Sequence, residues 1–264
     1  MTPIHTDIPA TIPRAALVTG AARRVGRSIA IALAQAGFDL ALHCHTSRKA
    51  CETTAEEIRA LGCRAEVVQT DLADEAQTSR LVPGAAEAIG PLGVLVNNAS
   101  VFERDEWHDT TRASWDAHLE PNLRAPFMLI QHFARRLPEG AEGVVVNMLD
   151  QRVWSLTPHF VSYTLSKAAL WALTQTMALA LAPRIRVNGI GPGPSLPNSR
   201  QTPQQFARQA ASVPLRHGAP PEEIGRAVIF ILGMPSMTGQ MIALDGGQHL
   251  QWSSTRTDPP VGGE

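Results

Sequence analysis

Short apolar runs that alternate with helical patterns constrain the fold of this chain more than any other feature. Each run has five or six residues rich in Val, Leu, Ile and Ala, and the segments between them carry apolar residues at helical spacing. The predicted strands cover 15–20, 38–43, 65–70, 92–97, 143–148, 185–190 and 241–245. The predicted helices lie at about 25–36, 48–61, 74–89, 111–136, 161–182, 203–211 and 221–232. Strands that alternate with helices in this way pair in parallel, because a helix crosses over the sheet between two strands.

This pattern predicts an α/β fold: a single doubly wound parallel sheet of about seven strands, of the Rossmann type, with helices on both faces. The 264 residues are 44% hydrophobic, which suits one domain with a large core. We expect that domain over 14–252, with ligands bound beyond the carboxyl ends of the strands. We expect 1–13 to be flexible and the polar segment 253–264, rich in Pro and Gly, to be disordered.

Composition excludes several classes of function. The formal net charge is −1 and the basic residues are scattered, so we expect a small-molecule ligand and neither a nucleic-acid nor a membrane partner. No run approaches about 18 apolar residues, and the N-terminus lacks the pattern of a signal peptide. Cys44, Cys51 and Cys63 form no CxxC pair and are interpreted as free thiols of a reducing compartment. We therefore expect a soluble, cytoplasmic protein without a metal site.

The segment directly after the first predicted strand reads TGAARRVG over 19–26. Gly20 and Gly26 carry no Cβ, so a phosphate can approach the backbone N–H groups at the start of the next helix. Because this turn joins a strand to a helix, it predicts a site for the pyrophosphate of a dinucleotide. A purely structural turn is the alternative.

The residues that end the second strand favour NADPH over NADH. An NAD-binding protein places a carboxylate here, against the ribose 2′-hydroxyl, and the segment 43–48 has none. Arg23, Thr46, Ser47 and Arg48 instead offer cationic or hydroxyl donors that suit a 2′-phosphate. Solvated loop residues with no role in cofactor binding are the alternative.

Other polar residues stand at the ends of predicted strands. His43 and His45 are metal ligands by type, but without a third ligand nearby we favour a structural or cofactor-contacting role. Asp71 closes the third strand and Asn98 follows the fourth, where the two riboses of a dinucleotide would lie. A short polar residue at a strand end can equally be a turn former.

Tyr163 and Lys167 are four residues apart within the predicted helix 161–182, which places the phenol and the ammonium on one helix face. A neighbouring ammonium favours the phenolate, so this spacing predicts a pKa of Tyr163 below its usual value of about 10. Such a phenol can donate and accept a proton during a reaction. An ordinary surface pair is the alternative.

The motifs TGAARRVG, NNAS, YTLSK, VNGIGPG and DGG, in this order and spacing, resemble the short-chain dehydrogenase/reductase family over roughly 14–250. The resemblance implies that Tyr163 is the general acid, that Lys167 holds the nicotinamide ribose and lowers the pKa of the tyrosine, and that Asn122 steadies a water in a proton relay. It also implies a homotetramer or homodimer. The residues that the resemblance and the motifs assign to NADPH are Gly20, Arg23, Arg24, Val25, Gly26, His43, His45, Thr46, Ser47, Asp71, Leu72, Asn98, Ala99, Ser100, Met148, Tyr163, Lys167, Pro192, Gly193 and Ser195.

Asp150 stands thirteen residues before Tyr163, where most members of that family have a serine. A serine hydroxyl donates to a ketone oxygen, whereas an ionised carboxylate only accepts. Asp150 is therefore better matched to a nitrogen heterocycle, whose N–H groups donate and whose ring nitrogen takes up a proton. We predict Asp150, Tyr163 and Lys167 as the catalytic residues.

Six segments, TGAARRVGRSIA, LHCHTS, NNASVF, NMLD, GPGPS and DGGQHL, are similar to the pteridine reductases and to the short-chain dihydromonapterin and dihydrofolate reductases. This resemblance implies that NADPH reduces a dihydropterin (dihydromonapterin, dihydrobiopterin or dihydrofolate) to its tetrahydro form. It implies that Phe102 stacks on the pterin ring, the alternative being a core aromatic. The residues implied to contact the substrate are Arg24, Ser100, Phe102, Asp150, Tyr163, Pro194 and Ser195.

Two other functions stay open. In a short-chain reductase of ketones or other carbonyls, Asp150 would be an incidental substitution, and an NADPH-binding regulatory protein would bind the cofactor without turnover. The segment 191–203 contains four prolines. With the helix that follows, it is the predicted substrate lid at about 191–212, and an ordinary connector is the alternative.

Overall fold

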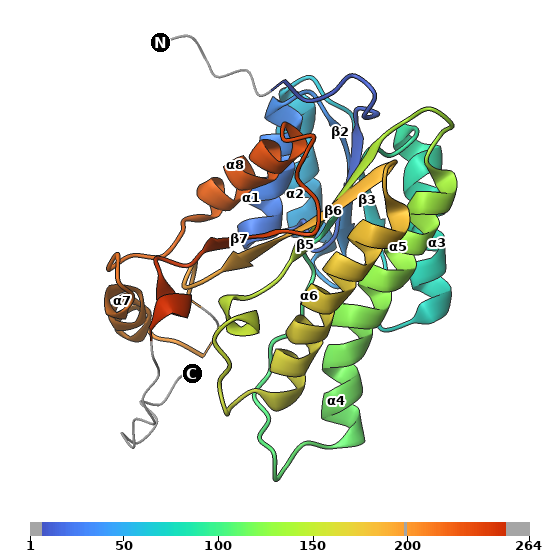
Figure 1. Cartoon of the computed structure of the whole chain (residues 1–264). Coiled ribbons are helices and arrows are strands. Elements are labelled where there is room, and N and C mark those ends of the chain that lie inside the picture. The colour runs from blue at the N-terminus through green and yellow to red at the C-terminus, as the bar shows by residue number, and fades with distance from the viewer. Residues whose placement is uncertain (1–6, 198–199, 252–264) are drawn as a thin grey trace, which may run out of the picture.

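The computed structural model describes residues 7–197 and 200–251, in which strands and helices alternate (Figure 1). The strands are β1 (Ala15–Val18), β2 (Asp39–Cys44), β3 (Ala65–Gln69), β4 (Val94–Asn97), β5 (Gly143–Met148), β6 (Ile185–Pro192) and β7 (Met241–Leu244). The α-helices are α1 (Arg24–Gln35), α2 (Arg48–Ala60), α3 (Glu75–Ile89), α4 (Arg112–Leu119), α5 (Ala125–Arg136), α6 (Val161–Leu181), α7 (Pro203–Ser212) and α8 (Pro221–Leu232). Shorter helical turns are η1 (Glu120–Arg124), η2 (Gln151–Val153) and η3 (Gln248–Leu250).

The strands form one parallel sheet in the order β3-β2-β1-β4-β5-β6-β7. The order reverses at β1, which has β2 on one side and β4 on the other. This is the doubly wound sheet predicted from the sequence, so the fold class is confirmed. Such a reversal leaves a crevice at the carboxyl ends of the two central strands, where ligands of these folds bind.

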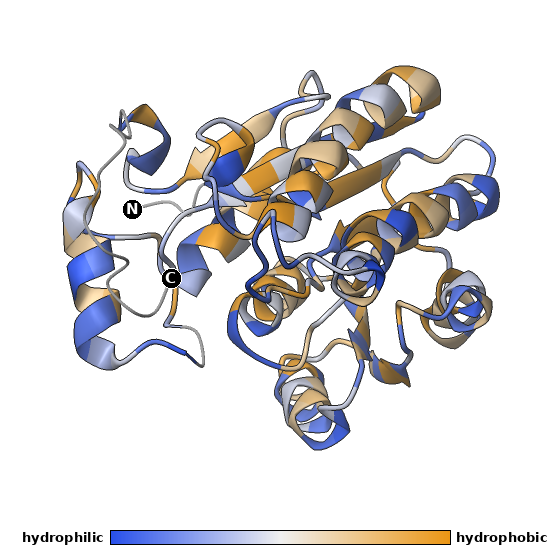
Figure 2. Cartoon of the chain, turned by 90° about the horizontal axis from the view of Figure 1, so that it is seen from below, coloured by the Kyte–Doolittle hydropathy of each residue, from blue (hydrophilic) through white to orange (hydrophobic). Residues whose placement is uncertain are grey.

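Helices cover both faces of the sheet, because successive residues of each strand point to opposite faces. Val18 and Val96 pack with residues of α1, α2 and α8, whereas Leu17 and Leu95 pack with residues of α3 and α5. Both faces are therefore buried, which explains why the strands are continuous apolar runs in the sequence. Figure 2 shows hydrophobic residues concentrated along the central strands, with hydrophilic residues on the surrounding helices.

The helix predicted over 111–136 is not a continuous α-helix. α4 ends at Leu119, and the π-helical turn η1 follows before α5 begins at Ala125. Pro121 lies in η1 and has no N–H to donate to the preceding turn, so the chain widens locally. The widened turn carries Asn122, which is buried.

Ile12 lies within the segment expected to be flexible. It is 1% exposed and belongs to the larger hydrophobic core, together with residues of β1, α1 and α8. Residues 1–6 of that predicted segment and 253–264 of the predicted tail lie outside the described residues. Within the described ranges, no helix is both long and apolar enough to cross a membrane.

Candidate active site

The glycine turn between β1 and α1 is held against the end of β4. Gly20 has a φ of +65°, in the left-handed region that favours glycine. A Cβ on Gly26 would lie 2.1 Å from the carbonyl oxygen of Gly20, so only glycine fits there. Asn98 donates from its side-chain amide to the carbonyls of Thr19 at 2.8 Å and Gly20 at 3.1 Å. Asn98 therefore fixes the turn in place from the neighbouring strand.

His43 in β2 supports the same turn from the other side. Its Nδ1 accepts a hydrogen bond from the Gly20 N–H at 3.1 Å, and its Nε2 donates to the carbonyl of Thr70 at 2.9 Å. Burial lowers the pKa of His43 to about 4, so the ring is neutral at neutral pH. Both ring nitrogens are engaged, which supports a structural role. The described part of the chain contains no group of three or more His, Cys, Asp or Glu that could hold a metal.

A cavity of about 600 Å³ opens where β1 to β4 end, and we call it the cofactor cavity. It brings together most of the residues predicted to contact a dinucleotide, namely Gly20, Arg23, Arg24, Val25, Gly26, His43, His45, Asp71, Leu72, Asn98, Ala99 and Ser100. Sequence reasoning missed Ala73, Val101, Ala117 and Pro121, which also line it. Pro121 lines the cofactor cavity because η1 folds against the end of β4, and the sequence alone gave no sign of that contact.

Residues at the start of α2 that were predicted to bind a 2′-phosphate do not line this cavity. Thr46 is exposed and Ser47 is half-buried just before α2, while Arg48 lies 3.5 Å from Glu52 on the same helix. His45 does line the cavity, with its Nε2 at 3.8 Å from the carboxylate of Asp71.

A second cavity of about 310 Å³, the substrate cavity, adjoins the first, since Arg24, Val25 and Ser100 line both. It gathers the other residues predicted for the substrate or the nicotinamide, namely Phe102, Asp150, Tyr163, Pro192, Gly193, Pro194 and Ser195. It is also lined by four residues of the predicted lid, namely Leu196, Gln201, Phe206 and Gln209. Sequence reasoning missed Leu149, Gln151, Arg152 and Gln248. Arg152 carried a usable signal, because it follows the end of a strand by only a few residues. Gln248 did not, since it reaches the cavity from a distant segment.

Tyr163 and Asp150 form a hydrogen-bonded pair in the wall of the substrate cavity. The Tyr163 hydroxyl donates to Asp150 Oδ2 at 2.8 Å, and only 6% of Tyr163 is exposed. Burial, and then the negative charge of Asp150, raise the pKa of Tyr163 well above its usual value. The lowered pKa predicted from the spacing to Lys167 is therefore wrong, because the carboxylate lies at the hydroxyl whereas the ammonium lies 5.9 Å from the ring centre. The phenol keeps its proton at neutral pH.

Lys167 is buried beneath the pair. Its Nζ donates to the carbonyl oxygen of Met148 at 2.8 Å, and neither residue lines a cavity wall given above. Burial lowers the pKa of Lys167 to about 8, and the charge of Asp150 opposes that shift. The carbonyl of Met148, at the end of β5, thus fixes the ammonium close to the residues that follow the strand.

Asp150 is held by Arg152 as well as by Tyr163. The Arg152 backbone N–H donates to Asp150 Oδ1 at 2.8 Å, and its guanidinium donates to Oδ2 at 3.2 Å. The side chains are 17% and 13% exposed for Arg152 and Asp150. Arg152 therefore places a donor on each oxygen of this largely buried carboxylate.

Phe102 forms part of the cavity wall and is not a plain core residue. Its ring stacks on Phe160 with centroids 4.6 Å apart and meets Tyr163 edge-on, also at 4.6 Å. The guanidinium carbons of Arg152 and Arg200 lie 5.4 and 5.3 Å from its centre. Phe160 therefore already occupies part of the surface on which a substrate ring was expected to stack.

Asn122 binds the segment that leads into Phe102. Its side-chain amide accepts from the Val101 N–H at 2.8 Å and donates to the Val101 carbonyl at 2.9 Å and to Ser166 Oγ at 3.1 Å. These bonds tie η1, the end of β4 and α6 together. Asn122 thus holds these three segments together. The role of steadying a water, which the resemblance implies, stays a prediction.

Arg24 connects the glycine turn with the predicted lid. Its guanidinium donates to the carbonyls of Pro197 at 2.7 Å and Leu196 at 3.3 Å. Residues 198 and 199 of the predicted lid lie outside the described residues.

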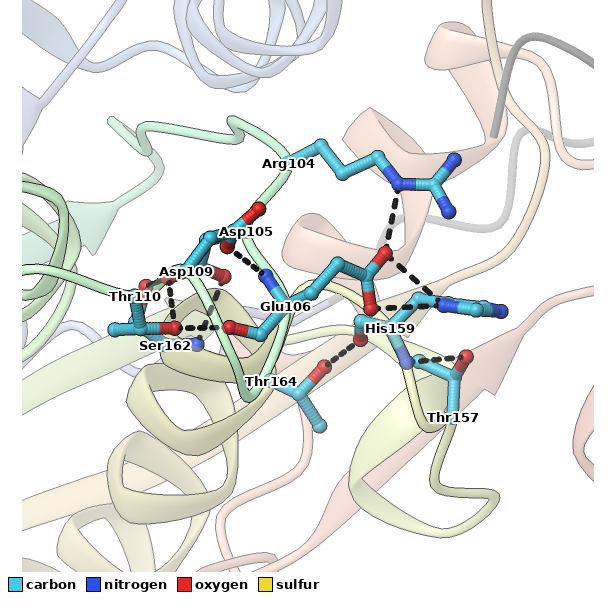
Figure 3. A network of polar contacts seen from close by, with 9 residues as sticks. All are labelled: Arg104, Asp105, Glu106, Asp109, Thr110, Thr157, His159, Ser162 and Thr164. Carbon is cyan, nitrogen blue, oxygen red and sulfur yellow. Dashed lines mark hydrogen bonds and ion pairs between the residues drawn. The ribbon is translucent and has the colours of Figure 1, made fainter.

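A polar network fixes the N-terminus of α6, the helix that carries Tyr163 (Figure 3). Asp105 accepts hydrogen bonds from the Ser162 N–H at 3.1 Å and the Ser162 hydroxyl at 2.5 Å. Phe160 precedes the helix with a φ of +56° and offers no capping side chain, so Asp105 caps the helix from a distant loop. Glu106, which pairs with Arg104 and His159, ties the same loop to the residues before the helix.

The comparisons with known proteins agree with this geometry. Residues 20–249 match a family model described as enoyl-(acyl carrier protein) reductase. The chain is 32% identical over 243 residues to the short-chain dehydrogenase/reductase eriH of Hericium erinaceus, covering 88% of this chain and 96% of that protein. It belongs to the short-chain dehydrogenase/reductase family.

Two further members of this family bear on the chemistry. 3-Oxoacyl-[acyl-carrier-protein] reductase FabG of Staphylococcus aureus is 29% identical over 245 residues, covering 90% of this chain and 98% of that protein. The crystal structure of FolM alternative dihydrofolate reductase 1 from Brucella suis, in complex with NADP, is 48% identical with a TM-score of 0.89. It covers 93% of this chain and 98% of the other. This short-chain dehydrogenase/reductase is thus an oxidoreductase by family, with the hydrogen-bonded Tyr163–Asp150 pair and two cavities at the strand ends.

Proposed function

We propose that this protein is an NADPH-dependent reductase of dihydropterins, forming the tetrahydro product. The observation that carries the proposal is the 2.8 Å hydrogen bond from Tyr163 to Asp150, in a cavity wall where most of the family has serine. The carboxylate of Asp150 accepts hydrogen bonds, and it therefore suits a substrate whose ring bears N–H groups. A plain ketone brings no such donor.

The residues present fit a dinucleotide. The glycine turn offers backbone N–H groups at the start of α1, and Arg23, Arg24 and His45 place cationic or polar groups around the cofactor cavity. No carboxylate follows β2, which supports NADPH over NADH. When bound, NADPH supplies the hydride for the carbon of a C=N bond.

The proton for the adjacent ring nitrogen is assigned to the Tyr163–Asp150 pair. Tyr163 keeps its proton at neutral pH because burial and Asp150 raise its pKa, so it serves as the store of that proton. Asp150 fixes the direction of the hydroxyl, and Lys167 lies fixed below by the Met148 carbonyl. We assign these three residues as the catalytic group, and the residues of the two cavities as cofactor and substrate contacts.

The similarity to FolM alternative dihydrofolate reductase 1 from Brucella suis supports a pterin or folate substrate. The similarity to FabG of Staphylococcus aureus favours a second candidate, reduction of a ketone. Asp150 discriminates between them, because its carboxylate cannot donate to a ketone oxygen when ionised. A cytoplasmic location stays a prediction.

The test follows NADPH oxidation with dihydrobiopterin, dihydromonapterin, dihydrofolate and a panel of ketones. We expect turnover of a dihydropterin or dihydrofolate by the wild type, and losses of about 100-fold or more in Asp150→Ser and Tyr163→Phe. Asp116→Ser on α4, a carboxylate that pairs with Arg112 away from both cavities, is the matched control. Turnover confined to ketones, or full activity in Tyr163→Phe, would sink the proposal. Cofactor binding without any turnover would instead favour a regulatory protein.

A further inference from the structure

The strongest feature that the proposed reaction does not use is the guanidinium of Arg152. It contacts Asp150 Oδ2 at 3.2 Å, and the same residue's backbone N–H binds Oδ1 at 2.8 Å. Both oxygens of the carboxylate are therefore held by one residue. Oδ2 also accepts the Tyr163 hydroxyl at 2.8 Å, so guanidinium, carboxylate and phenol form one chain of contacts.

The location of Arg152 is fixed by aromatic rings as well as by charge. Its guanidinium carbon lies 5.4 Å from the centre of Phe102 and 5.5 Å from that of Phe160, and these two rings stack on each other. Arginine beside aromatic faces loses little hydration and keeps its planar group in place. The side chain is 17% exposed and lines the substrate cavity, so it lies at the reacting end of that cavity.

We propose that Arg152 is a positioning residue, which holds both oxygens of the Asp150 carboxylate and directs its Oδ2 at the Tyr163 hydroxyl. The inference rests on the proposed function, since it explains how the carboxylate acts as an acceptor in a largely buried wall. Without the guanidinium, the largely buried carboxylate loses a charged donor at Oδ2 and can turn away from the cavity, where it would no longer meet the N–H groups of a substrate. Arg152 thus acts on the substrate through Asp150.

Kinetics separate the charge of Arg152 from its packing. Arg152→Met keeps most of the apolar contact with Phe102 and Phe160 but removes the charge, whereas Arg152→Lys keeps the charge. We expect kcat to fall about 30-fold in Arg152→Met and less than about fivefold in Arg152→Lys, with NADPH affinity unchanged in both. Arg14→Met is the matched control, because Arg14 lies 5.1 Å from the centre of Phe38 and lines neither cavity. Wild-type kcat in Arg152→Met, or equal losses in the Met and Lys variants, would overturn the proposal.

A spectroscopic readout tests the inference without any substrate. Tyr163 is the only tyrosine in the chain, so tyrosinate absorbance reports on this site alone. The charged groups that face it are Asp150 and Arg152 after β5 and Lys167 on α6, and the His118 ring of α4 lies 6.1 Å away.

The absorbance is recorded within seconds of a jump to high pH, before the protein unfolds. We expect Arg152→Met to ionise Tyr163 at a higher pH than the wild type, and Arg152→Lys to match the wild type, because a nearby cation favours the phenolate. An unchanged absorbance profile in Arg152→Met would contradict the inference. If the wild type reduced only ketones, the proposed function would be wrong. The absorbance measurement would still decide the role of Arg152, because it needs no substrate.

Discussion

At the scale of single residues, burial sets the properties of the polar side chains in and around the site. The sequence left His43 as either a cofactor contact or a structural residue. In the fold, both of its ring nitrogens form hydrogen bonds with the backbone, one with Gly20 and one with Thr70. Tyr163 and Lys167 are both buried, and burial shifts their pKa values in opposite directions. The physical reason is that burial penalises the charged form, which is the phenolate in one case and the ammonium in the other.

The pH dependence of stability should report the burial of His43. Its pKa is about 4 in the folded protein and 6.5 in the unfolded chain, so the unfolded chain takes up a proton first as the pH falls. The stabilisation is fully present above pH 6.5 and is lost as the pH falls towards 4, by up to about 3 kcal/mol. Urea unfolding at several pH values should show a smaller loss in His43→Gln than in the wild type. Parallel curves for the two proteins would show that His43 is not the group responsible.

At the scale of elements, the start of α6 decides where Tyr163 lies relative to Asp150. The helix begins after a residue in the left-handed conformation, Phe160, and takes its cap from Asp105 in the loop before α4. His118 of α4 joins the network through the Ser162 hydroxyl, at 2.7 Å. Because Tyr163 is the third residue of the helix, any movement of its first turn moves the phenol relative to Asp150.

Removal of the distant cap should lower both stability and activity. Asp105→Ala removes the acceptor for the Ser162 N–H and hydroxyl, and we expect the free energy of unfolding to fall by about 2 kcal/mol. Thr111→Ala is the matched control, since Thr111 caps α4 and its loss should cost about 1 kcal/mol. Urea unfolding and kcat/KM are measured for both. The control should keep its kcat/KM, and a normal kcat/KM in Asp105→Ala would contradict the link between this cap and the site.

At the scale of the whole molecule, the two cavities lie along the carboxyl ends of the strands and share a wall. Arg24 stands at that wall and also contacts the segment after β6, so residues far apart in the sequence meet there. An apolar groove of about 270 Å³ lies elsewhere, lined by Leu119, Leu123, Phe127 and Leu173 with Glu120 and Arg124. Exposed apolar surface of this kind is typical of contacts between subunits.

The resemblance to the family predicts a homotetramer or homodimer, and the groove makes that prediction specific. We expect light scattering coupled to size exclusion to give two or four times the chain mass of 28.4 kDa. Phe127→Glu should shift the mass towards that of fewer subunits, because a charge is costly in an apolar interface. Leu61→Glu, at an exposed site on the end of α2, is the control. A single-chain mass for the wild type would rule out the predicted assembly.

The sequence by itself determined the sheet and the glycine turn, and its resemblance to the family marked Tyr163, Lys167 and Asp150 as candidate catalytic residues. These features are local: apolar runs reveal strands buried on both faces, and a glycine required by close approach leaves a recognisable turn. The break at Pro121 was readable in principle, because proline cannot continue the hydrogen bonds of a helix.

Only the tertiary structure decided the electrostatics of the site and the composition of its walls. The direction of the Tyr163 pKa depends on the distance from its hydroxyl to Asp150, and helical spacing to Lys167 does not contain that distance. Gln248 reaches the substrate cavity from η3, and Asp105 caps a helix that begins far along the chain. The pKa of a side chain depends on its burial and on contacts with distant segments. A local pattern of residues contains neither kind of information.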